Sequence, residues 1–382
     1  MDFRDNIKNA KRIVFKFGTN ALINKSGDLS LSRIYAFIES ITELKKQGKE
    51  IIIVTSGAVG VGAKKLGLLE KPALVTMKQA CAAIGQGELM SIYEEGFNKF
   101  SIITAQILLT EDDFSNRKKY LSLRSTLNHL LELNVIPVIN ENDTVSTNEL
   151  ECFNSDGVTV CFGDNDKLSA LVMSKLDADL LIIMSDIDGL YNDDPKINKN
   201  VKVIPLIKEI TPDIQKLGFE ASKSGRGGMK TKLEAAKVAV RSGGMAIIAN
   251  GKKADTITRI FNGEEIGTLF LPEEHLSSKK RWIAYATTIF GHVKVNDGAK
   301  NAVIEKNASL LSAGITEIKG RFKQGDVISI LDNNNEEFAR GIVNFSNTEC
   351  KKIIGKHSDE IESVLGHKNY DTVISRDNIA IL

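Results

Sequence analysis

Short, unbroken apolar runs recur through residues 12–270 of this chain, and they restrict the fold more than any other feature. The clearest is Ile51-Ile52-Ile53-Val54, which leads directly into a glycine-rich turn. A strand that is apolar on both faces must be buried on both faces, as in a parallel sheet covered by helices. The same rhythm recurs at residues 13–15, 102–109, 135–139, 180–184 and 246–249. The sequence therefore predicts an α/β fold, an αβα sandwich around a mainly parallel sheet.

Segments with helical spacing lie between these runs. Residues 32–47 carry apolar side chains at intervals of three and four, and Gly48 follows as a stop signal. Residues 126–133 and 230–240 show the same periodicity. Strands and helices that alternate in this way are typical of a doubly wound sheet, whose ligands bind beyond the carboxyl ends of the strands.

From about Trp282 the pattern changes to short alternating runs and turn residues. Such runs occupy residues 293–295, 327–331 and 338–343, and they predict a small β-rich domain. A chain of 382 residues is also too long for one ordinary core. We therefore expect a large domain over residues 1–275, a linker over residues 276–289 and a small domain over residues 290–382.

Polar residues follow four of the expected strands. They are Lys16, Gly18 and Thr19 after the first, residues 55–62 after the second, Asn140-Glu141-Asn142-Asp143 after a third and Ser185-Asp186 after a fourth. One polar strand end is an ordinary turn. Four in one parallel sheet predict a binding site at that edge.

A glycine-rich segment, Ser224-Gly225-Arg226-Gly227-Gly228-Met229-Lys230-Thr231-Lys232, stands at the head of a helical run. Glycines let backbone N–H groups approach a phosphate, and a helix N-terminus adds partial positive charge. Lys230 and Lys232 add full cations, and Lys16 supplies another from far upstream. Two lysine-bearing turns indicate a polyphosphate held from both sides, and thus phosphoryl transfer.

Each of these features also has a structural interpretation. Lys16 at a strand end is in the usual place for a surface lysine, although Phe15 and Phe17 must point to the opposite face. Asp166 in the run Gly163-Asp164-Asn165-Asp166 is placed to cap a helix over residues 167–175. No GxxxxGK[ST] motif occurs, and Ser56-Gly57-Ala58-Val59-Gly60 lacks GxGxxG spacing. The combination of these features favours function over structure.

The composition narrows the class of protein. Fifty Lys and Arg face 49 Asp and Glu, which removes the strong positive charge of a dedicated nucleic-acid binder. No window approaches the roughly 18 apolar residues of a membrane span, and the first residues lack the apolar core of a signal peptide. Four scattered cysteines and five histidines show no metal-ligand spacing. We expect a cytoplasmic protein with reduced thiols, no zinc and no membrane partner.

Taken together, these motifs resemble those of the amino-acid kinase family. The segments that carry the resemblance are VFKFGT at 14–19, IVTSGA at 53–58, PVINEND at 137–143, GDND at 163–166, SD at 185–186, GLY at 189–191 and GGMKTK at 227–232. The segment KRWI at 280–283 then leads into what resembles a PUA domain, a small β-barrel-like fold. The resemblance covers nearly the whole chain and is strongest to the members that phosphorylate glutamate.

The resemblance implies a reaction and a set of roles. ATP with Mg²⁺ would phosphorylate the γ-carboxylate of L-glutamate, the first step of proline biosynthesis, in an enzyme whose metal ligands the motifs do not identify. Lys16, Lys232 and Asp166 would be catalytic. The implied glutamate-binding residues are Ser56, Gly57, Asn140, Asp143 and Asn165. The implied ATP-binding residues are Lys16, Ser185, Asp186, Arg226, Gly227, Gly228, Met229, Lys230, Thr231 and Lys232.

Two departures from the family pattern bear on ligand binding. The connection over residues 144–162 is longer than usual, in a region where the family binds glutamate and responds to proline as a feedback inhibitor. Arg226 stands where a smaller residue is common. The resemblance also implies a homodimer or homotetramer.

Other functions remain as alternatives. They are acetylglutamate, aspartate or uridylate kinase activity and, from a different class, RNA binding through the PUA-like domain. Residues 291–382 carry twelve Lys and Arg against thirteen Asp and Glu, which disfavours RNA binding.

Overall fold

The computed structural model describes residues 3–24, 27–68, 70, 72–115, 117–145, 165–195, 197–198, 200–218, 228–273, 278–284, 289–367 and 370–382. The chain divides into two compact units. The first consists of Met1–Asp113 and Lys118–His275, and the second of Phe114–Arg117 and Leu276–Leu382. No described helix is both long enough and apolar enough to cross a membrane.

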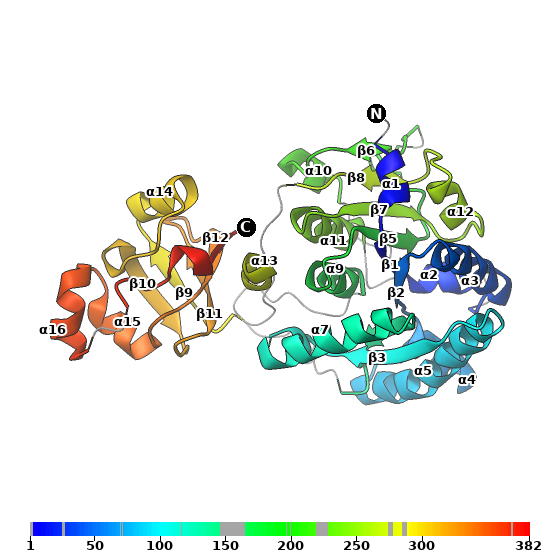
Figure 1. Ribbon diagram of the computed structural model, residues 1–382, viewed down its shortest axis with the longest axis horizontal. Helices are drawn as coiled ribbons and strands as arrows, with labels where there is room; N and C mark the ends of the chain where they lie inside the picture. Colours follow the sequence, from blue (N-terminus) through cyan, green and yellow to red (C-terminus); the bar gives the residue numbers. More distant parts are fainter. Residues whose placement is uncertain are drawn as a thin grey trace. The chain divides into compact units, whose positions relative to one another are not determined.

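The first unit is built on an eight-stranded sheet with the strand order β3-β4-β2-β1-β5-β7-β8-β6 (Figure 1). All neighbouring pairs are parallel except β7 and β8. The strands are β1 (Arg12–Phe17), β2 (Glu50–Val54), β3 (Thr104–Leu109), β4 (Ile136–Glu141), β5 (Leu180–Ser185), β6 (Leu206–Ile207), β7 (Met245–Asn250) and β8 (Thr268–Phe270). The predicted, mainly parallel sheet is confirmed, and β6 and β8 are additions to it.

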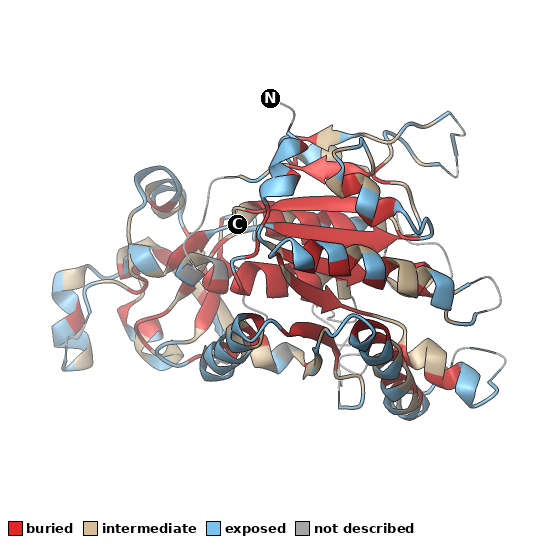
Figure 2. Cartoon of the chain, turned by 45° about the vertical axis from the view of Figure 1, so that its right-hand side comes forward, coloured by how far each residue is buried: buried red, intermediate tan, exposed pale blue. Residues whose placement is uncertain are grey.

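Helices cover both faces of this sheet (Figure 1). Buried side chains of α3, α5 and α12 join one core with alternate residues of the central strands, whereas α9 and α11 pack on the opposite face. The helices are α1 (Asp5–Asn9), α2 (Thr19–Leu22), α3 (Leu31–Lys46), α4 (Ala58–Lys65), α5 (Val75–Asn98), α6 (Glu111–Ser115), α7 (Arg117–Glu132), α9 (Asn165–Lys175), α10 (Pro212–Lys216), α11 (Met229–Arg241) and α12 (Thr256–Phe261). Figure 2 shows the central strands buried throughout, as the continuous apolar runs predicted.

Strand β1 places one charged residue in a buried position. Phe15 and Phe17 point into the core on the α3 face, where Phe17 stacks on Phe37 with ring centroids 5.0 Å apart. Because side chains alternate along a strand, Lys16 faces the α9 side. Its residue surface is only 5% exposed. Lys16 is therefore not the surface lysine that its strand-end position alone would suggest.

The second unit has its own five-stranded sheet with the order β10-β9-β11-β12-β13 and its own core. Its strands are β9 (Gly291–Val295), β10 (Ile315–Gly320), β11 (Val327–Leu331), β12 (Glu337–Ile342) and β13 (Ile379–Ile381). Its helices are α13 (Ser278–Ala284), α14 (Asp297–Lys306), α15 (Asn347–Ile353) and α16 (Ile361–Leu365). The three predicted strands are present as β9, β11 and β12. Helix α13 lies where we expected a linker and packs against β12 and β13.

Candidate active site

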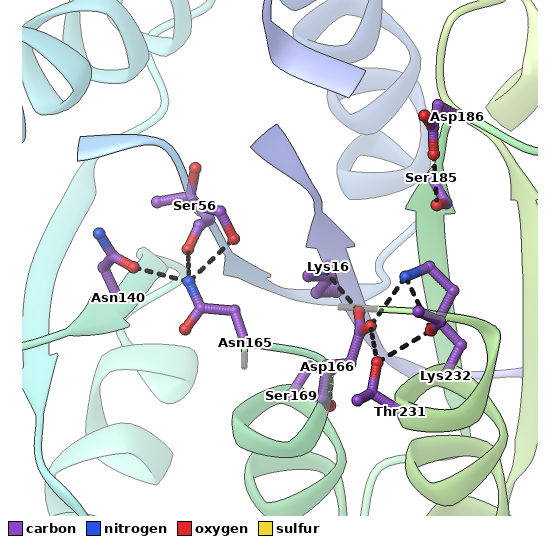
Figure 3. Close-up of polar contacts among 12 residues, drawn as sticks. Lys16, Ser56, Asn140, Asn165, Asp166, Ser169, Ser185, Asp186, Thr231 and Lys232 are labelled. Atoms are coloured by element: carbon purple, nitrogen blue, oxygen red, sulfur yellow. Dashed lines mark hydrogen bonds and ion pairs between the residues drawn. The ribbon is translucent and has the colours of Figure 1, made fainter. Parts of the chain in front are cut away.

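Two lysines and one aspartate form a buried ion-pair cluster at the carboxyl edge of the large sheet. Lys16 Nζ lies 2.5 Å from Asp166 Oδ1, and Lys232 Nζ lies 3.0 Å from Asp166 Oδ2. Asp166 is completely buried and the two lysines nearly so. Figure 3 shows the three side chains converging from β1, α9 and α11. We call these three residues the lysine cluster.

Local sequence explains how each member is held. Asp166 is the second residue of α9, where a carboxylate interacts favourably with the helix dipole, and Ser169 Oγ donates to its backbone oxygen at 2.6 Å. Lys232 projects from the first turn of α11, and Thr231 Oγ1 lies 3.2 Å from Asp166 Oδ2. Gly18 leaves room beside Lys16, because a Cβ there would lie 3.4 Å from Lys16 Nζ and 3.3 Å from the Met184 oxygen.

This environment keeps Asp166 ionised. Burial by itself would raise the pKa of Asp166, but the charges of Lys16 and Lys232 and their hydrogen bonds outweigh burial and lower it to about 2. At neutral pH the cluster thus has one negative and two positive charges. The excess of positive charge suits a site that neutralises a transferring phosphoryl group. Asp166 is inside the helix, so the interpretation of it as an N-cap residue is wrong.

A second group, made of neutral side chains, lies beside the lysine cluster at the ends of β2 and β4 (Figure 3). Asn165 Nδ2 is 2.6 Å from the Thr55 backbone oxygen, 2.9 Å from Ser56 Oγ and 2.9 Å from Asn140 Oδ1. Asn140 Nδ2 in turn donates to Gln86 Oε1 at 2.8 Å. We call Asn165, Ser56, Asn140 and Gln86 the amide network. Its polar atoms can hold the α-substituents of an amino acid.

Two turns shape the space around the amide network. Gly57 joins β2 to α4 with φ 103°, a left-handed conformation that side chains other than glycine rarely adopt. Asp143 lies in the turn directly after β4 and is partly exposed. The structure therefore places four of the expected glutamate-binding residues at two adjacent strand ends, namely Ser56, Gly57, Asn140 and Asp143. The fifth, Asn165, reaches this group from the first position of α9.

The expected nucleotide-binding residues lie on the other side of the lysine cluster. Ser185 ends β5, and its Oγ donates to Asp186 Oδ1 at 3.3 Å. Asn20 Nδ2 donates to Asp186 Oδ2 at 3.0 Å, and Lys252 Nζ lies 3.8 Å from the same oxygen. Gly228, Met229, Lys230, Thr231 and Lys232 form the N-cap and first turn of α11. Arg226, Gly227 and the long connection over residues 146–164, with Cys152 and Cys161, lie outside the described residues.

Sequence reasoning missed three residues of this edge. Gln86 and Tyr93 stand seven positions apart on α5, so they share one helix face. Tyr93 Oη lies 3.1 Å from Thr55 Oγ1, and burial raises the pKa of the Tyr93 hydroxyl. Asn20 follows Thr19 in α2. For Gln86 and Tyr93 the sequence offered no clear signal, because Gly85, Gly87 and Gly96 interrupt the helical pattern of residues 75–98.

Comparison with known proteins agrees with this geometry. A model of the amino acid kinase family matches residues 11–250, and a model of the PUA domain matches residues 291–365. The chain belongs to the amino acid kinase family. The predicted fold class, the predicted enzyme class and the predicted PUA domain are thereby confirmed.

Relatives of this amino acid kinase match it over nearly its full length. A glutamate 5-kinase of Caldanaerobacter subterraneus subsp. tengcongensis is 47% identical, with 97% of this chain and 98% of that protein covered. A glutamate 5-kinase of Methanosarcina acetivorans is 46% identical, with coverage of 100% and 97%. A glutamate 5-kinase of Geobacter sp. is 43% identical, with coverage of 98% and 99%. These relatives confirm the resemblance to glutamate-phosphorylating members of the family.

Proposed function

We propose that this amino acid kinase transfers the γ-phosphoryl group of ATP to the γ-carboxylate of L-glutamate and forms γ-glutamyl phosphate. The buried lysine cluster is the observation that carries the proposal, because two ammonium groups meet one carboxylate at the sheet edge. The relatives named glutamate 5-kinase support the choice of acceptor.

The chemistry needs no general base. A carboxylate with a pKa of about 4.3 is already an anion at neutral pH. The enzyme must therefore bring two anions together, align them in line and neutralise the charge of the transferring group. Lys16 and Lys232 would contact that group from opposite sides. Asp166, with its low pKa, would hold both ammonium groups in place rather than accept a proton.

The strand order separates the two substrates. Asn140 is near the end of β4, Ser56 follows β2, Lys16 is on β1 and Ser185 is on β5. The four positions therefore lie along the edge in that order. Glutamate would bind over the amide network with its γ-carboxylate toward Lys16. ATP would bind on the β5 side, with its phosphates at the N-terminus of α11. The groups that react then meet at the lysine cluster.

Mg²⁺ would enter with the nucleotide. Among the residues that the structure describes, no group of three or more His, Cys, Asp or Glu side chains could hold a metal ion. Mg²⁺ is commonly bound by substrate phosphates and water with few protein ligands. The donor set here fits that arrangement, in which the ion neutralises phosphate charge while the lysines act on the transferring group.

The decisive assay uses purified protein, Mg²⁺-ATP and hydroxylamine, which traps an acyl phosphate as a hydroxamate. L-glutamate, N-acetylglutamate, L-aspartate and UMP are compared as acceptors, with ADP release as the common readout. Glutamate-dependent hydroxamate is the expected result. Turnover with another acceptor only would overturn the named substrate, and no turnover by folded protein with any of the four would overturn the assignment as a small-molecule kinase.

Further expectations attach to this proposal. The product would open proline biosynthesis, with proline as a feedback inhibitor and the protein acting in the cytoplasm as a homodimer or homotetramer. Proline titration in the hydroxamate assay tests the inhibition, and light scattering of the purified chain tests the assembly. RNA binding by the PUA domain is not part of the proposed function.

A further inference from the structure

Gln86 carries a buried hydrogen-bond donor that no described part of the protein satisfies. The residue is 8% exposed. Its Oε1 accepts from Asn140, but its Nε2 is buried without a hydrogen-bond partner in the described part of the chain. A buried, unpaired donor costs free energy, so its retention calls for an explanation such as a bound ligand.

The orientation of the Gln86 amide follows from a backbone group. The Glu141 N–H, whose identity as a donor is certain, donates to Asn140 Oδ1 at 2.9 Å. This bond turns Asn140 Nδ2 toward Gln86, where only an oxygen can accept. Oε1 of Gln86 must therefore face Asn140, and Nε2 must face away. The hydrogen-bond network thus fixes the amide donor of Gln86 on the side away from Asn140.

The position of Gln86 identifies which end of the substrate it would meet. Its partner Asn140 is on β4, two strands from Lys16 on β1, and strands are about 4.8 Å apart. In the proposed function glutamate lies over the amide network with its γ-carboxylate at Lys16, so its α-carbon would lie near Asn140. That α-carbon carries an ammonium group, which can only donate, and a carboxylate, which can only accept.

We propose that the Nε2–H of Gln86 donates to the α-carboxylate of the bound amino acid and makes Gln86 a specificity-determining residue. The inference rests on the proposed function, because it takes glutamate as the substrate. The Asp143 carboxylate, in the turn after β4, supplies the complementary acceptor for the α-ammonium. Gln86 thus binds the α-carboxylate, and Asp143 binds the α-ammonium group.

Two substrate analogues separate these contacts. 4-Aminobutanoate is glutamate without the α-carboxylate, and glutarate is glutamate without the α-ammonium. Gln86→Leu should reduce the preference for glutamate over 4-aminobutanoate, measured as a ratio of kcat/KM values, by about 10- to 100-fold, the range for a hydrogen bond to a charged group. The preference for glutamate over glutarate should stay the same. Asp143→Asn should show the reverse pattern.

A second variant keeps the test clear if the leucine disturbs packing. Gln86→Glu retains an oxygen that can accept from Asn140 but replaces the donor with a second acceptor. It should raise the KM for glutamate at least as much as Gln86→Leu, and leave the KM for ATP within about twofold. Gln106→Leu, an exposed position on β3, is the matched control. Circular dichroism with thermal unfolding establishes that each variant is folded.

The possible outcomes are distinct. Absence of glutamate-dependent hydroxamate with the unaltered protein would defeat the proposed function itself. If that protein is active but both Gln86 variants keep its preference for glutamate over 4-aminobutanoate, the donor serves a buried water only and the inference is wrong. Where the turnover of an analogue is too slow to follow, its inhibition constant against glutamate gives the same ratio.

Discussion

The lysine cluster and the amide network lie side by side on one sheet edge, but different forces hold them. Three buried charges define the lysine cluster, and each ammonium depends on the same carboxylate. The amide network consists of neutral groups joined by hydrogen bonds of 2.8–2.9 Å. Removing one partner of a buried ion pair costs about 3–5 kcal/mol, whereas a neutral hydrogen bond contributes about 1 kcal/mol.

Because the lysine cluster is charged and the amide network is neutral, we expect the two regions to have different roles. Charge fixed in a water-poor site stabilises a transition state, because its effect is greatest where new charge develops. In the proposed function the amide network would contact the α-substituents, away from the reacting atoms. Such contacts act on the ground state and transition state alike, so they select the substrate more than they accelerate the reaction. Variants of the lysine cluster should mainly lower kcat, and variants of the amide network should mainly raise the KM for glutamate.

Asp166→Asn should have the largest effect, because it removes the only negative charge of the lysine cluster and leaves Lys16 and Lys232 repelling each other. We expect a loss of about 3–5 kcal/mol in the free energy of unfolding at pH 7, and a loss of more than about 10²-fold in kcat, by analogy with the removal of other preorganised groups. Urea unfolding and the hydroxamate assay measure the two effects. Unchanged stability would show that the three charges do not act as a unit.

The same variant has a pH signature. The pKa of Asp166 is about 2 in the folded protein and about 3.9 in an unfolded chain. Its ionisation therefore adds stability, about 2.6 kcal/mol, that is fully present above about pH 5 and is lost progressively as pH falls toward about 1. The difference in urea midpoint between the unaltered protein and Asp166→Asn should narrow over that range. A difference that is constant from pH 6 to pH 2.5 would contradict the low pKa.

Lys16→Ala and Lys232→Ala come next. Each should lower kcat by about 10²–10³-fold, since in the proposed function each would remove one cation from the transferring phosphoryl group. The KM for glutamate should change only severalfold. Lys46→Ala, at an exposed lysine of α3, is the matched control and should leave kcat unchanged. A large rise in the KM for glutamate with normal kcat in either variant would contradict the proposal that the lysine cluster mainly determines kcat and the amide network mainly determines the KM for glutamate.

Asn165→Ala tests the amide network in the same way. Asn165 is the neighbour of Asp166 in α9, but within the described part of the chain its amide nitrogen donates only to Thr55, Ser56 and Asn140. We expect the KM for glutamate to rise about tenfold, the equivalent of about 1.4 kcal/mol, with a smaller change in kcat. Steady-state kinetics at saturating ATP checks this. A fall in kcat as large as that of Lys232→Ala would mean that adjacent residues of α9 share one role.

The sequence predicted the lysine cluster better than the amide network, and the reason is physical. Continuous apolar runs mark β1, β2, β4, β5 and β7 directly, so the residues that follow them could be placed at one edge. Strand alternation put Lys16 opposite Phe15 and Phe17. The pairing of Asp166 with Lys232, 66 positions later, came from resemblance alone, because periodicity carries no information about contacts at such separation.

Helix α5 shows what local pattern could not predict. Its glycines weaken helical propensity and resemble turn signals. In the structure they allow close packing, since a Cβ on Gly85 would overlap the Ala58 backbone oxygen of α4. Strands β6 and β8, of two and three residues, are too short for any periodicity to reveal. Tertiary packing rather than local sequence determines where α5, β6 and β8 form. Because α5 was not predicted, its site residues Gln86 and Tyr93 were not predicted either.

Tyr93→Phe should have the smallest effect and test the outer limit of the amide network. The Tyr93 hydroxyl touches only Thr55 Oγ1 in the described residues, and Thr55 meets Asn165 through its backbone oxygen rather than its side chain. Loss of this buried hydrogen bond should cost about 1 kcal/mol in unfolding free energy, with kcat and both KM values within about twofold. Urea unfolding and steady-state kinetics measure these. A tenfold rise in glutamate KM would extend the amide network to Tyr93 and make the α5 face, rather than the strand ends alone, the structure that selects the substrate.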